Sequence, residues 1–187
     1  EHWVSRGALD IDGMGPKIIE ALIDADMLHD VVDYYDLTAD ELAQVKRGDE
    51  GNADGSDRVI GAKNANKIVG QIAASKEQPF SSVLFGLGIR NIGKTTAEAL
   101  AKGFGDIDAL MEAGVPALTQ IDGIGDIVAQ SVVDFFAVDA NRDLVERLRQ
   151  AGLTMEADLS DMKPQTLAGL TFVLTGSLER YDRSTAE

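Results

Sequence analysis

The chain has 187 residues, of which 44% are hydrophobic and 5% aromatic, and it carries a formal net charge of −15. This composition is normal for a packed globular protein, and no apolar run approaches the length of a membrane-spanning helix. The lack of cysteine excludes disulfides and cysteine zinc sites within this sequence. With only His2 and His29 as histidines, we expect no metal site.

The sequence predicts a mostly helical protein in which local signals mark several helix ends. Thr38 and Glu41 form a capping box, so a helix starts at Ala39. Pro79 ends one helix, and Gly152 occupies the C-cap position of another. In chain order we expect helices at residues 17–25, 29–35, 39 onward, 63–76, 80–87, 106–113, 116–120 and 141–151, with two more that follow turns at residues 89–93 and 121–125.

Composition changes beyond residue 155 and indicates a domain boundary. Residues 156–165 are acidic and poorly patterned, so we expect a linker there. Residues 167–178 have the pattern of a β-strand followed by a glycine turn, and a lone strand is not a stable sheet. We therefore expect an all-α domain at residues 1–155 and the truncated start of an α/β domain at residues 166–187. The first residue is not Met, and we expect a segment of a larger protein.

Four short segments of the chain repeat one another. They are IDGMG at residues 11–15, VIG at 59–61, IRNIG at 89–93 and IDGIG at 121–125. Gly61, Gly93 and Gly125 lie 32 residues apart, and a fixed period of this size indicates stacked copies of one supersecondary unit. Gly15 and Gly61 are 46 residues apart, which we attribute to a polar surface loop inserted at residues 46–57.

Each copy joins a glycine turn to the start of a predicted helix. Apolar residues recur at the fourth, seventh and eighth positions past the last glycine, which is one face of a helix. At the fourth position they are Ile19, Ala65, Ala97 and Ala129. Free backbone N–H groups at the positive end of a helix dipole bind anions. Four such turns predict a surface for a polyanion, most simply the backbone of a nucleic acid.

Charge is the main argument against nucleic acid, and it is spread unevenly. Duplex binders are usually basic, because neutralising phosphates drives their affinity. The third copy has Arg90, Lys94 and Lys102 around it against Glu98 alone. The fourth has three aspartates and no Lys or Arg, and Asp126 directly follows the turn glycine, where it competes with a phosphate. We expect the third copy to contact phosphate best and the fourth least.

Three segments in this order resemble the C-terminal part of bacterial NAD-dependent DNA ligases. They are SRGALDIDGMGPKIIEALI, FGLGIRNIGKTTAEALA and LAGLTFVLTGSLERYDRSTAE. The resemblance covers nearly the whole chain, and its specificity lies in the order of the segments. It implies four tandem helix–hairpin–helix motifs, followed by the start of a BRCT domain. The adenylation domain, the oligonucleotide-binding fold and the zinc finger of that family would precede this chain.

The resemblance implies a chain that grips duplex DNA on both sides of a nick without reading bases. Arg90 is the best candidate to enter the minor groove or grip a phosphate, or else it is an exposed turn arginine. The lysines after the turn glycines are expected phosphate contacts, or else solvated helix residues, and not the lysine that ligases adenylate. The expected DNA contacts are Gly13, Met14, Gly15, Lys17, Gly61, Lys63, Arg90, Asn91, Gly93, Lys94, Thr95, Gly123 and Gly125.

The same resemblance sets expectations for chemistry and partners. We expect no catalytic residue, metal or bound cofactor in this chain, because NAD, Mg²⁺ and a structural Zn²⁺ would belong to the other domains of the parent enzyme. The expected partners are nicked double-stranded DNA and the other domains of the same ligase, with no membrane. The chain should act as a monomer in the cytoplasm, on the nucleoid.

Three positions carry specific expectations for the turns. Val59 stands where the first and fourth copies have Gly13 and Gly123, so we expect a distorted second hairpin or a weak DNA contact. A β-branched residue at Gly93 or Gly125 is expected to remove the backbone geometry of the turn while helicity survives.

Three other functions compete with this interpretation. A helix–hairpin–helix module of another repair protein would share the turns but not the BRCT start. A structural or protein-interaction scaffold is supported by the net charge of −15. A self-contained enzyme is disfavoured, because the sequence has neither a nucleophile–histidine arrangement nor a GxxxxGK phosphate loop.

Overall fold

The computed structural model describes residues 1–46 and 58–158. The helices are α1 (Pro16–Asp24), α2 (Ala39–Gln44), α3 (Ala62–Ser75), α4 (Phe80–Gly86), α5 (Lys94–Phe104), α6 (Ile107–Met111), α7 (Val115–Leu118), α8 (Asp126–Phe136) and α9 (Asp139–Gln150), with 3-10 turns η1 (His2–Val4) and η2 (Asp33–Tyr35). Within the described residues, β pairing is limited to two isolated bridges. The all-α prediction is confirmed, whereas most of the predicted insertion and the strand at 167–178 lie outside the described residues.

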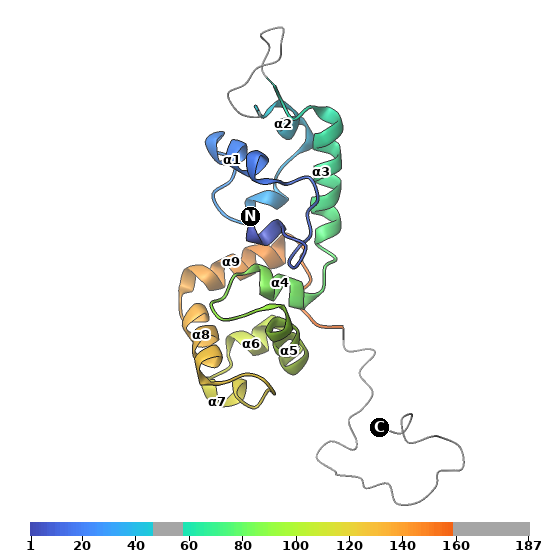
Figure 1. Cartoon of the computed structure of the whole chain (residues 1–187). Coiled ribbons are helices and arrows are strands. Elements are labelled where there is room, and N and C mark those ends of the chain that lie inside the picture. Colours follow the sequence, from blue (N-terminus) through green and yellow to red (C-terminus); the bar gives the residue numbers. More distant parts are fainter. Residues whose placement is uncertain (47–57, 159–187) are drawn as a thin grey trace, which may run out of the picture.

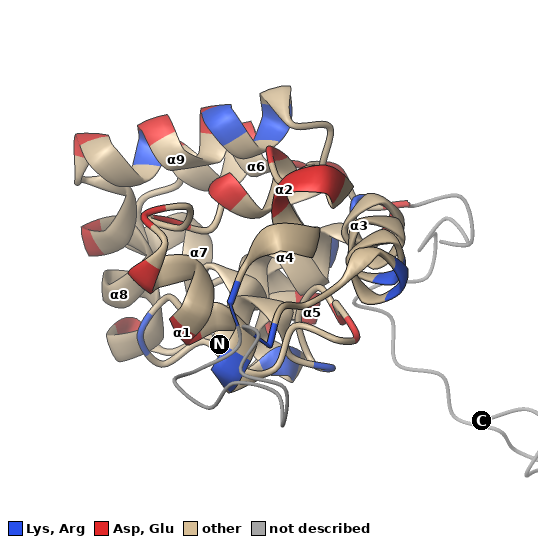
Figure 2. Cartoon of the chain, turned by 90° about the horizontal axis from the view of Figure 1, so that it is seen from above, with Lys and Arg blue, Asp and Glu red and all other residues tan. Residues whose placement is uncertain are grey.

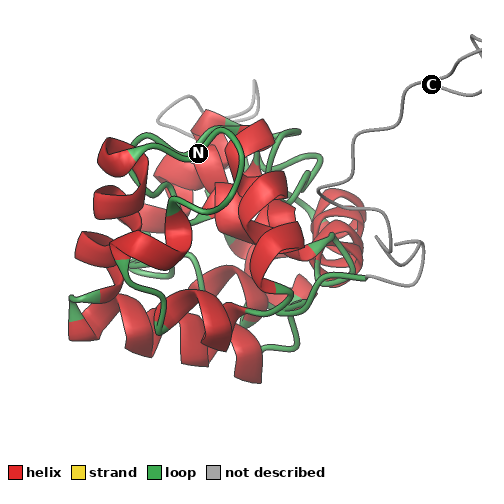
Figure 3. Ribbon diagram, turned by 90° about the horizontal axis from the view of Figure 1, so that it is seen from below, coloured by secondary structure: helices red, strands yellow, loops and turns green. Residues whose placement is uncertain are grey.

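The described residues form two halves that share a boundary (Figure 1). The first half, residues 1–76, contains α1, α2 and α3, and α2 packs against α3. The second half, residues 80–157, contains α4 to α9, and α4 packs against α5. Each half joins two motifs through a connector, which is η2 in the first half and α6 in the second. Figure 3 shows the whole body as helices joined by short loops.

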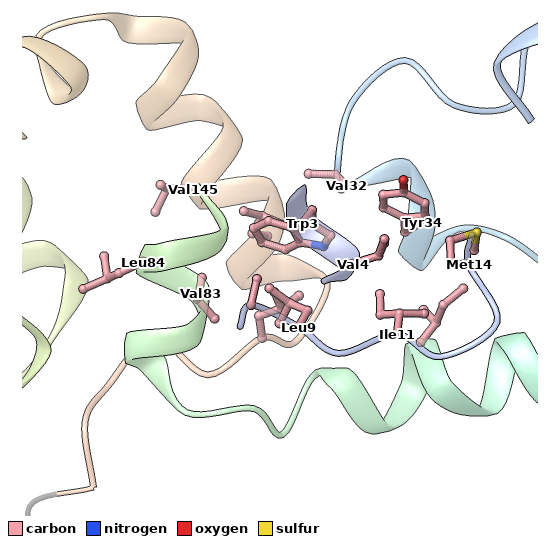
Figure 4. Close-up of a cluster of buried hydrophobic side chains, with 14 of the residues drawn as sticks. Trp3, Val4, Leu9, Ile11, Met14, Val32, Tyr34, Val83, Leu84 and Val145 are labelled. Carbon is pink, nitrogen blue, oxygen red and sulfur yellow. The ribbon is translucent and has the colours of Figure 1, made fainter. Parts of the chain in front are cut away.

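One hydrophobic core runs through both halves. Trp3 from η1 is 2% exposed and lies in the same cluster as Val83 of α4 and Val145 of α9 (Figure 4). Gly86 of α4 allows this contact, because a Cβ atom there would lie 2.9 Å from the Trp3 ring. Burial of apolar area is the main favourable term in folding, so the halves stabilise each other.

Polar contacts also join the halves near the α3–α4 connection. The backbone N–H and the hydroxyl of Thr154 both donate to the carbonyl of Lys76, at 3.2 and 3.0 Å. Arg147 of α9 forms an ion pair with Asp30 of the first half.

The amide of Ala157 donates to the carbonyl of Gly105 at 2.7 Å, so the packed body continues into the segment predicted as a linker.

Most helix boundaries agree with the sequence prediction to within two residues, including the capping box at Thr38. The predicted helix at 29–35 is wrong, because only η2 forms there. The carboxylate of Asp33 accepts the amides of His29 and Asp30, at 2.6 and 2.9 Å, and that of Asp30 accepts the amide of Val32. A helix at 29–35 would need the amide of Tyr35 to bond four residues back, but it donates to the carbonyl of Val32 at 2.8 Å, so only a 3-10 turn forms.

Candidate nucleic-acid interface

Three of the four repeated segments form the same tight turn. In each, the carbonyl of the first isoleucine accepts the amide three residues on, and the third residue has a positive φ. The hydrogen bonds are Met14 to Ile11 (3.4 Å), Ile92 to Ile89 (3.1 Å) and Ile124 to Ile121 (3.1 Å), and the φ angles are 91° at Gly13, 64° at Asn91 and 81° at Gly123. This is the pattern of a type II turn, which requires a residue that tolerates positive φ at its third position.

The fourth residue of each turn belongs to the core. Met14 is 3% exposed, and its counterparts Ile92 and Ile124 are 8% and 5% exposed. The side chain of Met14 is therefore not free to meet DNA, and only its backbone remains for the contact expected there. The sequence holds the signal for this role, since the same position is apolar in every copy, Ile60 included.

The glycine that ends each regular turn is the N-cap of the helix that follows. Gly15, Gly93 and Gly125 have φ between −92° and −76°, an ordinary extended conformation. A Cβ atom added at any of them meets nothing within 4 Å. The expectation that a β-branched residue at Gly93 or Gly125 would remove the turn geometry is therefore wrong. Neither backbone strain nor packing within the described residues requires glycine here, and its absence of a side chain leaves the helix end uncovered.

The helices after these turns also lack a side-chain cap. No side chain accepts a hydrogen bond from the first-turn amides of α1, α5 or α8 at the N-cap. Among the described helices, α2 has such a cap from Thr38 and α6 has one from Asp106, whereas α3, α4, α7 and α9 are also without one. Uncapped first-turn N–H groups at the positive end of a helix dipole are suited to an anion.

The second copy has a different structure. Its Val59 pairs with Lys46 in an isolated antiparallel bridge, and the amides of Ile60 and Gly61 donate to Val45 and Ala43. Gly61 has the positive φ, 79°, at the N-cap itself. The expectation of a distorted second hairpin is confirmed, because backbone pairing replaces the turn. The four copies therefore differ in backbone structure, with the second as the exception.

Charged side chains collect unequally around the turns. The second residue of the helix is Lys17 in α1, Lys63 in α3 and Thr95 in α5. Lys94 is the first residue of α5, and Arg90 lies in the third turn. All five of these residues are exposed. Figure 2 shows Lys and Arg around the N-terminus, α1, α3 and α5, and acidic residues on α2 and α8. At the fourth turn, Asp126 begins α8 and the next residue, Ile127, is 76% exposed.

Two basic residues near the first turn were missed by the sequence analysis. Lys67 of α3 donates to the carboxylate of Asp12 at 2.6 Å. This hydrogen bond and the charge of Lys67 hold the pKa of Asp12 below its usual value, with smaller contributions from the Gly13 amide and from Arg6. No local pattern marks Lys67 or Arg6, because their place beside the turn depends on the tertiary fold.

These features define the class of protein. A family described as "SAM-like Helix-hairpin-helix tandem" matches residues 5–73, and one described as "Helix-hairpin-helix motif" matches residues 82–145. The two matches correspond to the two halves of the structure. The chain is therefore a tandem helix–hairpin–helix protein.

Similarity to whole proteins identifies the chain further. It is 42% identical over 179 residues to a protein named DNA ligase from Rubrobacter xylanophilus, covering 96% of this chain and 24% of that protein. Proteins of the same name from Gemmatimonas aurantiaca and Acidobacterium capsulatum are each 40% identical, covering 99% and 100% of this chain and 25% and 26% of their own lengths. The chain therefore belongs with the bacterial DNA ligases, as a segment that spans about a quarter of their length. This confirms the resemblance to bacterial DNA ligases, whereas the dependence on NAD and the BRCT start stay predictions.

Proposed function

We propose that this chain is the duplex-gripping segment of an NAD-dependent DNA ligase that seals nicks between a 5′-phosphate and a 3′-hydroxyl. The observation that carries the proposal is the bare, uncapped N-terminus of α1, α5 and α8. At each, a glycine with no conformational or packing requirement leaves the first-turn amides open. A DNA phosphate is the ligand that such an end suits in a ligase.

The grip would work through the backbone rather than through base readout. First-turn amides donate to phosphate oxygens, and exposed cations beside them, such as Lys17 and Lys94, add charge. Contacts of this kind position a protein on a duplex without specifying sequence. A ligase needs this property, since nicks occur at any sequence.

The chemical steps are proposed to lie in other parts of the parent enzyme. Within the described residues, no group of three or more His, Cys, Asp or Glu side chains is placed to hold a metal ion. From the resemblance to DNA ligases, we propose that NAD, Mg²⁺ and the structural Zn²⁺ would be held by those other parts. This chain would contribute by holding the two DNA ends in line, as a monomer within one polypeptide in the cytoplasm, on the nucleoid.

Among the described residues, every helix is too short or too polar to cross a bilayer. The remaining competitor is a scaffold in which the hairpins serve only to pack helices, and the strongly acidic composition supports it. Against it stands the combination of an N-cap glycine and a helix start without a side-chain cap after each regular turn, at α1, α5 and α8, which is an arrangement that suits a phosphate.

The test is fluorescence anisotropy of a labelled nicked duplex, titrated with the full chain at several salt concentrations. Binding should weaken with salt, with a log–log slope of about −0.9 for each phosphate contacted. The matched variant carries Arg90→Gln and Lys94→Gln and should show a shallower slope. Absence of binding at low salt, both by this chain and by an intact relative with its hairpins exchanged for these, would overturn the proposal in favour of the scaffold.

A further inference from the structure

A side-chain hydrogen bond connects the third turn to the fourth motif. The amide nitrogen Nδ2 of Asn91 lies 2.8 Å from Oγ of Ser131, which is on α8. Asn91 is the turn residue with positive φ, and Ser131 lies one helical turn beyond the start of the helix. The contact therefore crosses from one hairpin to the helix that the neighbouring hairpin leads into.

The direction of this hydrogen bond is fixed by a second one. The hydroxyl of Ser131 donates to the carbonyl of Ile127 at 2.9 Å. A hydroxyl has one proton, so the same oxygen accepts from Asn91. The chain of donors runs from Asn91 through Ser131 to Ile127, the second residue of α8. It ties the third turn to the helix end that the fourth turn presents.

The first half contains the same connection in different chemistry. Lys67 of α3 holds the carboxylate of Asp12 in the first turn. Lys67 follows Gly61 by six residues, and Ser131 follows Gly125 by six residues. In both halves, a turn residue of the first motif of the pair contacts the same helix position of the second motif. A shared position with unlike residues indicates a shared role.

Residue choice at Asn91 supports a role for its side chain. The equivalent residues of the other regular turns are Gly13 and Gly123, and glycine adopts positive φ without steric cost. Asparagine tolerates this conformation less well than glycine. The side chain of Asn91 forms a hydrogen bond with Ser131. This bond explains why the position holds asparagine, although glycine would be sufficient for the turn.

We propose that these bridges fix the spacing between the two hairpins of each pair, and that Asn91 is a positioning residue rather than a DNA contact. The Asn91–Ser131 bridge holds the third turn and the N-terminus of α8 at one separation, so that both meet the phosphates of a duplex together. The Lys67–Asp12 bridge does the same between the first turn and α3. The inference rests on the proposed DNA grip.

The test is a double-mutant cycle in the full chain with Asn91→Gly and Ser131→Ala. Asn91→Gly keeps the turn, because glycine occupies the same place in the first and fourth copies. Each single variant should weaken binding of a nicked duplex about threefold, and the double variant should be no weaker than either single one. Ser131→Thr retains the hydroxyl and should restore wild-type affinity, and Ser81→Ala on α4 is the matched serine control.

Two readouts separate this role from others. The melting temperature without DNA should change little in all variants, while the affinity for the nicked duplex changes. Additive losses, or a loss at Asn91 with none at Ser131, would show a direct DNA contact by Asn91 and overturn the inference. Parallel losses of melting temperature, with affinity unchanged in the folded protein, would show a purely structural bond and also overturn it. If neither the wild-type chain nor the intact relative that carries its hairpins binds the nicked duplex, the proposed function fails and this inference fails with it.

Discussion

The two halves of the domain pair their motifs with different local chemistry. In residues 1–76, one regular turn leads into α1, and backbone pairing around Gly61 replaces the second turn. In residues 80–157, both turns are regular. An ion pair links the motifs of the first half, and an uncharged hydrogen bond links those of the second. The tandem arrangement is thus kept while one turn and the bridge differ, so the helix packing defines the pair and the turn is free to vary.

Within the second half, the third and fourth turns have the same backbone geometry but opposite charges around them. The third and fourth turns share their hydrogen bond, and their N-cap glycines have φ of −92° and −89°. Basic residues surround the third turn, whereas Asp122 and Asp126 flank the fourth. Equal backbones with opposite charges make these two hairpins the best place to measure what backbone amides contribute alone.

The largest expected effect follows from filling the open space above a helix end. Gly93→Val should weaken binding of a nicked duplex about tenfold, or about 1.4 kcal/mol, because the side chain blocks access to the first-turn amides. The fold should survive, since φ at Gly93 is ordinary and a Cβ there meets nothing within 4 Å. Anisotropy measures the affinity, and circular dichroism measures the helicity.

Gly114 offers a matched control for this substitution. It is the N-cap of α7, with φ −88° and ψ 166°, but it does not end one of the four repeated segments. Gly114→Val makes the same chemical change in the same backbone conformation and should leave DNA affinity unchanged. Equal losses in both variants would mean that valine at an N-cap acts through helix stability, and the comparison between turns would lose its basis.

A smaller effect should come from charge at the two equivalent turns. Arg90→Gln with Lys94→Gln should make the salt slope of binding less negative by about 0.9 for each phosphate that the variant no longer neutralises. Asp122→Asn with Asp126→Asn should raise affinity, by no more than about fivefold, because exposed charges act weakly in water. No change from the aspartate substitutions would show that the fourth hairpin stands away from DNA.

The irregular second motif gives a finer comparison. Lys17 and Lys63 both occupy the second position of their helices, but only the first follows a regular turn. Lys17→Gln should weaken binding about threefold and Lys63→Gln less than twofold, as expected for exposed charges of unequal reach. Similar losses of affinity in both variants would indicate that the N-terminus of α3 is as accessible to DNA as the helix N-termini that follow regular turns.

A last comparison concerns alkaline pH and tests whether the two halves unfold independently. Burial, and to a lesser degree the charge of Glu1, raises the pKa of Tyr34 to about 12. An unfolded tyrosine ionises near pH 10, so the unfolded state loses its proton first. The stability that the neutral phenol contributes is present below about pH 10 and falls as pH rises toward 12.

Denaturant unfolding at pH 9 and pH 11 measures this dependence. Tyr34→Phe should reduce the loss of stability between the two pH values. Tyr34 and Tyr35, the tyrosines of the described residues, both lie in the first half. Because Trp3 packs with Val83 of the second half in one core, we expect a single unfolding transition at either pH. Two transitions at pH 11 would show that the halves unfold separately.

Much of this architecture was predictable from local patterns. The helices, the capping box at Thr38 and the irregular second copy all followed from residue types at fixed spacings. The absent helix at 29–35 did not, because apolar spacing does not reveal that the amide of Tyr35 bonds to Val32, three residues back rather than four. The geometry at Gly93 was also misjudged, since a glycine-rich turn does not say which of its residues carries the positive φ.

The contacts between motifs lay beyond the sequence for a different reason. Lys67 with Asp12 and Asn91 with Ser131 are separated by 55 and 40 residues. A pairing of this kind becomes visible only after the helices are placed. The repeat did contain one clue, the equal offset of Lys67 and Ser131 from their glycines, but unlike side chains at that offset concealed it.

The double hydrogen bond from Thr154 to the carbonyl of Lys76 has a consequence for any DNA held by both halves. These hydrogen bonds hold the short connection between α3 and α4, which is the expected place for a hinge between the halves. If the two halves do not move relative to each other, the duplex must bend to contact both of them. The free-energy cost of that bending depends on how easily the duplex deforms. A break in one strand relieves part of that cost, so a rigid body of this kind would distinguish interrupted from continuous DNA by its elasticity.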